Sequence, residues 1–332
     1  MRIALDAMGS DRAPAVEVAG AIAALRELED DFSLVLVGDC EAIEQELRGY
    51  PDAPRQRIEL RHAPGRIGMG EPPAQAIRRK PDSSIVVGLN LHKQGEVEAF
   101  ISAGSTGAVM AGSLFLLRAL PGVDRPAIGA VLPTAHGHVL LVDAGANVDT
   151  RPPHLLQFAH LGTIYAQDLL GVAAPRVGLL NIGEEPEKGD ERSVEAHRLL
   201  QASPTLNFVG NVEGRDLIQH ACDVLVCDGF VGNVVLKFYE SVAGFIVGLV
   251  RREVEVEHTR LDFAPVLRAL DYTEHGGAPL LGVNGVTIIC HGGSPPRAIR
   301  NAIRVARQAV RHHMVQHIQT RLARLAEGSE SL

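Results

Sequence analysis

Length, composition and charge limit what this chain can be. It has 332 residues, of which 46% are hydrophobic and 22% are charged, and these values are typical of a globular protein with a sizeable core. The formal net charge is −8 at pH 7, which argues against a dedicated nucleic-acid-binding protein because neutralising phosphates requires a basic surface.

The cysteines and the apolar stretches indicate the compartment. The sequence contains no CxxC pair among its cysteines, which are Cys40, Cys222, Cys227 and Cys290. We therefore expect reduced, buried thiols and no disulfide or zinc framework. The start, MRIALDAMGSDRAP, turns polar too early for a signal peptide. The longest uncharged apolar stretch of the C-terminal half, 241–250, is too short to cross a bilayer. These features predict a cytoplasmic protein that at most lies against a membrane.

Short apolar runs rich in valine, isoleucine and leucine recur along the chain, with helical segments between them. In chain order they are RIALDA (2–7), FSLVLVGD (32–39), SIVVGL (84–89), EAFISAG (98–104), HVLLVDAGAN (138–147), RVGLLNIG (176–183), LNFVGN (206–211), DVLVCDG (223–229) and GVTIICHG (285–292). This alternation predicts an α/β fold with a largely parallel sheet covered on both faces. In such sheets ligands bind at the carboxyl ends of the strands, so the loops that follow the runs are the candidate sites.

Composition gives no domain boundary. The sequence has no Ser/Gly-rich linker and no obvious internal repeat, so residues 1–325 are predicted to form a single α/β domain. A helical and loop segment at about 234–281 interrupts the regular alternation of strands and helices and is a candidate interface. The tail, 326–332, is predicted to be frayed.

The stretch FISAGSTGAVMAG (100–112) passes from a strand through a Gly/Ser/Thr turn into a helix of small residues. Backbone amides at such a turn and the helix dipole favour a phosphate or a carboxylate. Gly104, Ser105 and Thr106 are therefore candidate substrate-binding residues. The alternative is a tight turn in which the glycines only permit close packing, and the stretch is neither a Walker loop nor a GxGxxG motif.

Two further loops, DAGAN (143–147) and DGFVGN (228–233), each place an acid at a strand end, followed by glycine and asparagine. Asparagine can stabilise a developing oxyanion without titrating, and glycine lets a substrate approach the backbone. The residues that these loops offer for substrate binding or catalysis are Asp143, Asn147, Asp228, Gly232 and Asn233. Each loop alone is also typical of ordinary turn chemistry.

An acidic loop, LLNIGEEPEKGDERS (179–193), surrounds the single lysine Lys188. It could be a solvated strand-to-helix connection. It could instead present Lys188 at a strand end to an anion, with Glu184 and Glu185 holding the loop, because a lysine that keeps acids nearby remains charged.

Signatures of a nucleophilic enzyme are missing from the sequence. There is no GxSxG elbow, no HExxH motif and no Cys–His spacing typical of a catalytic thiol. His291, at the strand end ICHGGS, is retained as a substrate-binding candidate, although a satisfied polar side chain is the alternative. The pattern favours a reaction without a metal or a covalent enzyme intermediate.

Two basic features stand out against the acidic background. Between 295 and 311, arginines alternate spacings of three and four, so at about 100° per residue they share one helical stripe. This stripe is either a solvated helix face or a dock for an acidic protein or acidic lipid headgroups. The candidate docking residues are Arg297, Arg300, Arg304 and Arg307 in the stripe, and Arg78, Arg79 and Lys80 in a second cluster.

Read together, the loops resemble the PlsX family, the acyl-acyl carrier protein:phosphate acyltransferases of bacterial phospholipid synthesis. The similarity extends over nearly the whole chain, through LDAMGSDRAP, AIRRKPDSSI, ISAGSTGA, DAGANVD, LLQFAHLG, LLNIGEEPEKG, GNVEGRD, DGFVGNVVLK, GGAPLLGVNG and HGGS. So many matches in the same order make an accidental similarity untenable, although each motif alone is weak.

The resemblance implies a Rossmann-like three-layer α/β/α fold akin to isocitrate and isopropylmalate dehydrogenases and to phosphotransacetylases. It implies a homodimer attached peripherally to the cytoplasmic membrane, with no metal and no organic cofactor. The implied reaction transfers a fatty acyl group from acyl carrier protein to inorganic phosphate. The family's catalytic lysine and asparagine match Lys188 and Asn233.

Some positions depart from the pattern of the family. Ser10 and Ser105 stand where glycine and asparagine are usual, Cys290 precedes His291, and Pro295 stands where an aspartate is expected. Serine keeps hydrogen-bonding capacity, whereas Pro295 removes a carboxylate from its corner of the site.

Other functions remain as alternatives. A phosphotransacetylase-like enzyme would use the same fold with an acyl-coenzyme A donor. A dehydrogenase is disfavoured because the sequence has no dinucleotide fingerprint. A scaffold that gathers acyl carrier protein at a membrane would bind the carrier without turnover.

Overall fold

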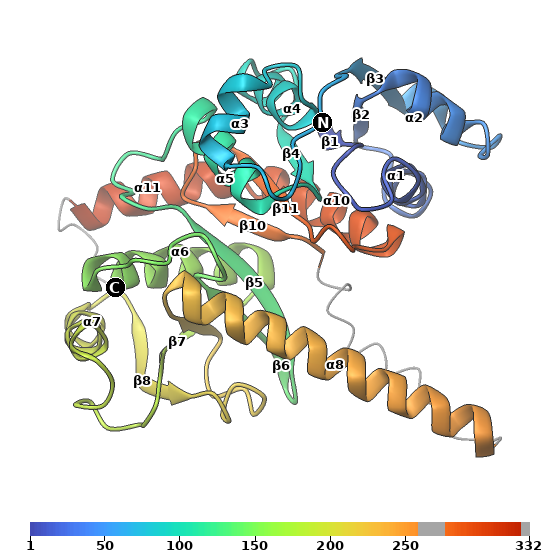
Figure 1. Ribbon diagram of the computed structural model, residues 1–332. Coiled ribbons are helices and arrows are strands. Elements are labelled where there is room, and N and C mark those ends of the chain that lie inside the picture. Colours follow the sequence, from blue (N-terminus) through green and yellow to red (C-terminus); the bar gives the residue numbers. More distant parts are fainter. Residues whose placement is uncertain (258–275, 327–332) are drawn as a thin grey trace. The chain divides into compact units, whose positions relative to one another are not determined.

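The computed structural model of the chain describes residues 1–257 and 276–326. Within these ranges the backbone divides into two compact units. Unit 1 comprises 1–126 and 276–326, and unit 2 comprises 127–257. Both units are mixed α/β structures with a mostly parallel sheet (Figure 1), which confirms the predicted fold class. The treatment of 1–325 as a single functional domain remains a prediction.

In unit 1 the strands lie in the order β3-β2-β1-β4-β11-β10. They pair in parallel except for β10, which is antiparallel to β11. The strands span β1 (Arg2–Asp6), β2 (Ser33–Gly38), β3 (Ile58–His62), β4 (Ala99–Ser102), β10 (Ala278–Leu281) and β11 (Val286–Ile289). Strands β4 and β11 are buried along their whole length, and β1 and β2 are buried after their first residue, as a sheet covered on both faces requires.

The helices of unit 1 lie on both faces of this sheet (Figure 1). Helices α1 and α10 pack against one another, and α10 contacts β4 and β11, whereas α4 contacts β1, β2 and β4 from the other side. The helices span α1 (Ala15–Glu27), α2 (Cys40–Leu47), α3 (Pro73–Arg79), α4 (Ser84–Lys93), α5 (Thr106–Leu116), α10 (Pro296–Arg311) and α11 (Met314–Ala326), with a short 3-10 turn at Arg55–Arg57.

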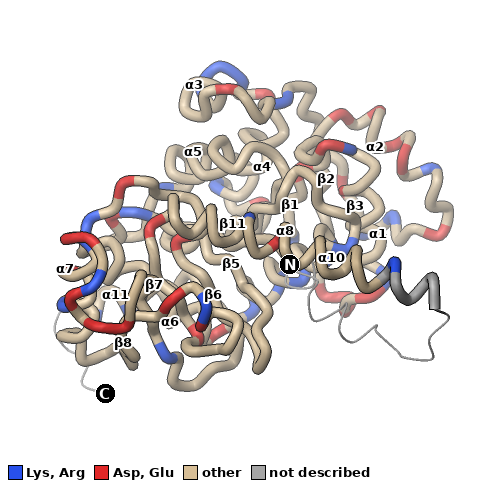
Figure 2. The backbone as a smooth tube through the Cα atoms, turned by 60° about the horizontal axis from the view of Figure 1, so that its bottom comes forward, with Lys and Arg blue, Asp and Glu red and all other residues tan. Residues whose placement is uncertain are grey.

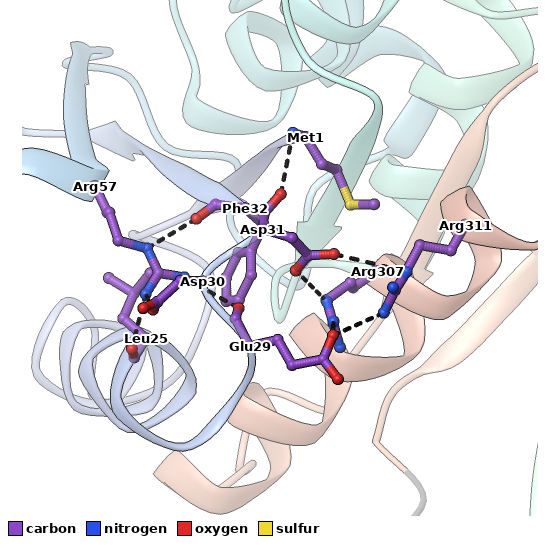
Figure 3. Close-up of polar contacts among 9 residues, drawn as sticks. All are labelled: Met1, Leu25, Glu29, Asp30, Asp31, Phe32, Arg57, Arg307 and Arg311. Atoms are coloured by element: carbon purple, nitrogen blue, oxygen red, sulfur yellow. Dashed lines mark hydrogen bonds and ion pairs between the residues drawn. The ribbon is translucent and has the colours of Figure 1, made fainter.

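The loop that follows α1 is held by arginines from two sides (Figure 3). From α10, Arg307 donates from Nε to Oδ1 of Asp31 at 2.6 Å and also pairs with Glu29. From the opposite side, Arg57 donates from Nε to the carbonyl oxygen of Phe32 at 2.9 Å. Arg307 is only 7% exposed, whereas its partners Glu29 and Asp31 lie on the exposed loop, so the contact between α10 and this loop joins a buried guanidinium to surface carboxylates.

In unit 2 the strands lie in the order β5-β6-β9-β7-β8. Only β5 is antiparallel to its neighbour, β6. The elements span β5 (Ala127–Thr134), β6 (Gly137–Val142), α6 (Pro152–Leu170), β7 (Arg176–Asn181), α7 (Glu191–Ala202), β8 (Asn207–Glu213), β9 (Val224–Val226) and α8 (Gly229–Glu257). The core lies between the sheet and the helices α6 and α7, around the fully buried Phe158.

Helix α8 (Gly229–Glu257) is much longer than the apolar stretch 241–250, which by itself is too short to cross a bilayer. Its part Gly229–Val250 has 22 residues and is long and apolar enough, by length and composition alone, to span a bilayer. A single helix of this kind is weak evidence for a span. The helix contacts β5 and β6 and continues beyond them (Figure 1).

One predicted strand is wrong. The run SIVVGL (84–89) forms the start of helix α4, because Ser83 caps the helix by accepting from the amide of Val86 at 3.4 Å and the buried apolar pattern continues to Leu91. Strands β3, β5 and β10 were not anticipated.

The four cysteines are free thiols, with Cys222, Cys227 and Cys290 buried and Cys40 partly exposed. The predicted interface segment at about 234–281 lies partly outside the described residues, as does most of the tail 326–332.

The buried arginine of α10 should contribute more to stability than its exposed neighbour. We expect Arg307→Met to lower the free energy of unfolding by about 1–2 kcal/mol, because a charge-assisted pair is lost while the aliphatic stem is kept. Arg311→Met, which removes a half-exposed partner of Glu29 at 3.0 Å, should cost under about 1 kcal/mol. Urea denaturation of both variants measures the difference.

The contribution of the Arg307–Asp31 pair to stability should decrease as the pH falls. The hydrogen bond from Arg307 lowers the pKa of Asp31 below its ordinary 3.8. Stability from this pair is therefore complete above that value and is lost as the pH falls through the lower pKa of the folded state. The gap between wild type and Arg307→Met should shrink in acid, and a gap that widened there would contradict this role of Asp31.

Candidate active site

Most of the residues predicted to act on substrate lie at one edge of the sheet of unit 2. The strands β6, β9 and β7 are parallel neighbours, so their carboxyl ends meet at this edge. The loop after β6 carries Asp143 and Asn147, the turn after β9 carries Asp228, and the loop after β7 carries Lys188. Helix α8 begins directly after Asp228 and brings Asn233 to the same edge.

Asp143 organises the loop after β6. Its Oδ1 accepts from the amides of Ile128 at 3.0 Å, Gly145 at 3.1 Å and Ala146 at 2.9 Å, and its Oδ2 accepts from the amide and the side chain of Asn147 at 2.7 and 2.8 Å. Burial raises the pKa of Asp143, and these donors oppose the rise. Because every partner is an N–H group, the geometry fits the carboxylate. Asp143 therefore holds the loop, and both of its oxygens are occupied.

The first turn of α8 packs directly onto this loop. A Cβ on Gly232 would lie 1.9 Å from the carbonyl oxygen of Asp143, and one on Gly229 would lie 2.7 Å from the amide nitrogen of Asn147. Side chains are excluded at both glycines, so helix and loop backbones are in contact. One residue beyond Gly232, the side chain of Asn233 faces Gly145, whose added Cβ would lie 3.6 Å from that of Asn233.

The loop carrying Lys188 is shaped by two asparagines on neighbouring strands. Asn181, at the end of β7, donates from Nδ2 to the carbonyl oxygen of Lys188 at 2.9 Å. Asn211, on β8, donates from Nδ2 to the carbonyl oxygen of Glu185 at 2.8 Å. The Oδ1 of Asn211 lies 2.9 Å from Nδ1 of the buried His197, which fixes the orientation of the amide. The backbone that presents Lys188 is thus held at two points.

The side chains of Lys188 and Asn233 differ from their surroundings. Lys188 is exposed, and its ammonium group makes no ion pair with any acid in the described part of the chain. The partly buried Asn233 likewise makes no side-chain hydrogen bond within residues 1–257 and 276–326. The acids of the loop do not neutralise Lys188: Glu185 holds the loop through its backbone carbonyl, and Glu184 is exposed. A cation and an amide are therefore available to a ligand.

Unit 1 has its own strand-end cluster, which contains the Gly/Ser/Thr turn. The hydroxyl of Ser102 donates to the buried carboxylate of Asp6 at 2.6 Å and accepts from the amide of Gly104 at 3.0 Å. Burial raises the pKa of Asp6. Ser105 caps α5 by accepting from the amide of Ala108 at 3.4 Å, so serine can serve at this position. Thr106 is the exposed first residue of α5.

The loop after β1 approaches the same edge of unit 1. Ser10 donates its amide to Oε1 of Glu17 at 2.7 Å, while the Ser10 hydroxyl and Oε2 of Glu17 are buried without a partner in the described ranges. Burial raises the pKa of Glu17 to about 7. His291, after β11, is exposed, and its Nδ1 accepts from the amide of Gly293 at 3.1 Å. No group of three or more His, Cys, Asp or Glu among the described residues is placed to hold a metal ion.

The two basic features have different surroundings. In the stripe on α10, Arg300 donates to Glu27 at 2.8 Å and Arg307 is nearly buried against Glu29 and Asp31, so these side chains are engaged within unit 1. Arg297 is exposed and Arg304 is partly exposed, and both make further interactions. The second cluster lies at the end of α3, where Figure 2 shows a basic segment. Arg78 and Arg79 are exposed, and Lys80 donates to Glu71 at 2.7 Å.

Sequence reading missed the residues that hold the loops, above all Arg192, Asn181 and Asn211. Arg192 lies in the first turn of α7, where a cation opposes the helix dipole. This unfavourable position was the available signal that Arg192 needs acidic partners. The two asparagines gave no signal, because an asparagine at a strand end is ordinary turn chemistry.

Comparison with solved structures defines the class of fold. The chain is similar to a phosphotransacetylase from Streptococcus pyogenes, with a TM-score of 0.64 and 17% identity over 93% of this chain and 94% of the other. A branched-chain phosphotransacylase from Enterococcus faecalis gives a TM-score of 0.58 and 16% identity over 94% and 100%. A 4-hydroxythreonine-4-phosphate dehydrogenase from Klebsiella pneumoniae gives 0.50 and 13% identity over 93% and 98%. At these identities the likeness shows the fold alone, and it confirms the predicted similarity of fold to phosphotransacetylases.

Sequence comparison shows the family. Residues 1–317 match the family described as "Fatty acid synthesis protein", and the chain belongs to this family. A curated relative from Heliobacterium modesticaldum, named "Phosphate acyltransferase", is 51% identical over 96% of this chain and 97% of its own length. Relatives of the same name from Desulforamulus reducens and Salinibacter ruber are 51% and 46% identical, over 97% and 92% of this chain and 97% and 93% of their own lengths.

The contact between Gly232 and Asp143 gives a paired prediction on one helix. Gly232→Ala should lower the free energy of unfolding by about 1–3 kcal/mol, because the methyl group would force α8 away from the carbonyl of Asp143. Gly244→Ala, further along α8 with nothing within 4 Å of the added Cβ, should raise it by about 0.5–1 kcal/mol through helix propensity. Thermal and urea denaturation of both variants test this. Equal effects of the two substitutions would contradict the close packing.

Proposed function

We propose that this chain transfers a fatty acyl group from the thioester of acyl carrier protein to inorganic phosphate, giving an acyl phosphate for phospholipid synthesis. The family and the name shared by its curated relatives support acyl transfer to phosphate. The observation that carries the proposal at the site is the pair Lys188 and Asn233. These two side chains have no partners in the described chain, although the loop that carries Lys188 and the start of α8, the helix that carries Asn233, are held by hydrogen bonds.

The reaction needs placement and charge stabilisation more than an activated side chain. A phosphate oxygen bonds to the carbonyl carbon, the carbon–sulfur bond breaks, and the proton of hydrogen phosphate ends on the departing thiol. Lys188 binds the phosphate or the developing negative charge, and Asn233 donates a hydrogen bond to the oxyanion of the tetrahedral intermediate. The turn at Gly104, Ser105 and Thr106 and the exposed His291 are proposed to contribute to substrate binding.

Asp143, Asn147, Asp228 and Gly232 shape this site through the loops that they hold. Their hydrogen bonds and close contacts fix the backbone around Asn233. Because these groups are already ordered before the substrate arrives, the reaction does not have to supply the free energy of arranging them.

The choice of acyl donor is a separate proposal. Acyl carrier protein is the proposed donor, and the exposed Arg78 and Arg79 with Lys80 on α3, and the α10 residues Arg297 and Arg304, are the docking candidates for its acidic surface. Arg300 and Arg307 are also candidates, and each of them, like Lys80, would have to exchange an ion pair within unit 1 for the acids of the carrier. The alternative is a phosphotransacetylase-like enzyme that uses acyl-coenzyme A.

A direct assay tests the reaction and the donor together. The purified protein is incubated with long-chain acyl-acyl carrier protein and phosphate, with acyl-coenzyme A in parallel, and acyl phosphate is trapped with hydroxylamine. We expect phosphate-dependent hydroxamate from the carrier-bound thioester. Product from acyl-coenzyme A alone would move the assignment to the alternative donor, and no product from either with folded protein would leave a scaffold that gathers the carrier.

Substitution at the two proposed catalytic residues should then lower turnover. Asn233→Ala should reduce kcat by about 10²–10³-fold, the usual loss for one oxyanion donor, and Lys188→Ala should cause a large loss with a raised KM for phosphate. Exposed residues of the same types serve as controls: Asn207→Ala on β8 and Lys93→Ala on α4 should retain wild-type rates. Near wild-type turnover of either catalytic variant would overturn its assignment.

We also propose that the chain is a cytoplasmic homodimer attached peripherally to the membrane. The support is a stripe of exposed aromatic residues on α8, in which Phe230, Phe238 and Phe245 are 61%, 71% and 66% exposed. This stripe is the proposed dimer surface. The loop LDFAPVLRAL (261–270), the proposed membrane contact, lies outside the described residues.

The role of the stripe on α8 can be tested separately. Phe238→Glu should convert the dimer to monomer in sedimentation velocity, because a buried carboxylate at an interface would be unpaired. Liposome co-sedimentation of the same variant distinguishes the two uses of the helix. Loss of liposome binding with the dimer intact would assign the stripe to the membrane instead.

A further inference from the structure

Arg192 contacts all three of the strand-end loops that build the site of unit 2. Its Nη2 donates to Oδ2 of Asp228 at 3.0 Å and to Oδ2 of Asp190 at 3.4 Å, and its Nη1 donates to Oγ1 of Thr150 at 3.4 Å. The side chain is 30% exposed. A planar guanidinium with several donors can hold such separate acceptors at once, whereas an ammonium is a single point.

The three acceptors come from different strands. Thr150 follows β6 and the loop organised by Asp143, Asp228 follows β9, and Asp190 ends the loop after β7 that carries Lys188. Arg192 itself stands in the first turn of α7, where its charge opposes the helix dipole. Its acidic contacts offset this unfavourable position, so the arginine is held where the three loops meet.

The contact with Asp228 reaches the start of α8. Oδ1 of Asp228 accepts from the amides of Phe230 at 2.9 Å and Val231 at 3.0 Å, so this carboxylate caps the helix while its Oδ2 is held by Arg192. Asp228 is 6% exposed and both of its oxygens are occupied. Asn233 lies in the turn that follows. Anything that moves Asp228 therefore moves the backbone amides of the first turn and, with them, the amide of Asn233.

We propose that Arg192 is a positioning residue that fixes the start of α8, and with it Asn233, relative to the loop that carries Lys188. This rests on the proposed function, in which those two side chains act on phosphate and the thioester. Arg192 acts through Asp228. Its guanidinium is already shared between two carboxylates, so it offers little uncompensated charge to a substrate phosphate.

Arg192→Met separates positioning from phosphate binding in the acyl phosphate assay. We expect kcat to fall about 100-fold, the scale of loss for a misplaced catalytic group, with the KM for phosphate unchanged, since no substrate contact is removed. Arg192→Lys should give an intermediate kcat, because an ammonium can retain the contact with Asp228 but not all three. The matched control is Arg198→Met on the same helix, and it should keep the wild-type rate. This arginine is 74% exposed and, among the residues that the structure describes, pairs only with Glu195.

A double-mutant cycle tests whether Arg192 works through Asn233. In an Asn233→Ala background, Arg192→Met should cost about ten-fold or less, because the group that it positions is gone. A full 100-fold loss in that background, or a raised KM for phosphate with kcat unchanged, would overturn the proposal and make Arg192 a substrate ligand. Wild-type kinetics of Arg192→Met would overturn it as well, while leaving the proposed function intact.

Amide hydrogen exchange keeps the inference testable if the reaction is misassigned. Loss of the link to Asp228 should speed exchange at Phe230 and Val231 by at least about ten-fold in Arg192→Met and leave it unchanged in Arg198→Met. If the wild-type protein forms no acyl phosphate but exchange responds in this way, the proposed function fails and the structural link stands. Unchanged exchange at both amides would show that Arg192 does not hold the start of α8.

Discussion

The carboxylate of Asp143 lies fully buried at the end of β6 and accepts hydrogen bonds only from N–H groups of its own loop and of β5. A buried charge is costly unless such donors surround it, so this carboxylate restricts the loop to the arrangement that supplies them. The position of the loop then constrains α8, whose first turn can approach only because Gly229 and Gly232 lack side chains. The placement of Asn233 follows from this sequence of constraints.

The same edge of the sheet shows how an enzyme of this kind can work without an activated nucleophile. Backbone and side-chain hydrogen bonds hold the loops around Asp143, Asp228 and Asn181, whereas the side chains of Lys188 and Asn233 have no partner in the described ranges. Polar groups that are fixed by their own hydrogen bonds do not need to reorganise when charge develops on a substrate. The hydrogen-bonded groups of these loops therefore determine the positions of the side chains of Lys188 and Asn233.

Sequence reasoning could identify this edge because strand-end motifs are local. The parallel runs, the loops at Asp143 and Asp228, and the lysine between acids are all visible in short stretches, and the strands converge by topology. It failed where a contact joins distant segments. The run SIVVGL became a helix because packing overrides the β propensity of its valines, and Arg307, read as a possible docking residue, is paired with acids that follow α1. Arg192 was missed for the same reason.

The acids around Lys188 also gain a physical role from the structure. Glu184, Glu185 and Glu187 are exposed on its loop and do not pair with it, so the surrounding field repels anions in general. Specificity is a difference between affinities, and repulsion of the wrong ligand contributes to it as much as attraction of the right one. An anion can be held here only where the ammonium of Lys188 outweighs its neighbours, which confines the proposed phosphate site to one point. Asn181 and Asn211 fix the position of this loop, and the loop can therefore keep the proposed phosphate site at a constant position relative to Asn233.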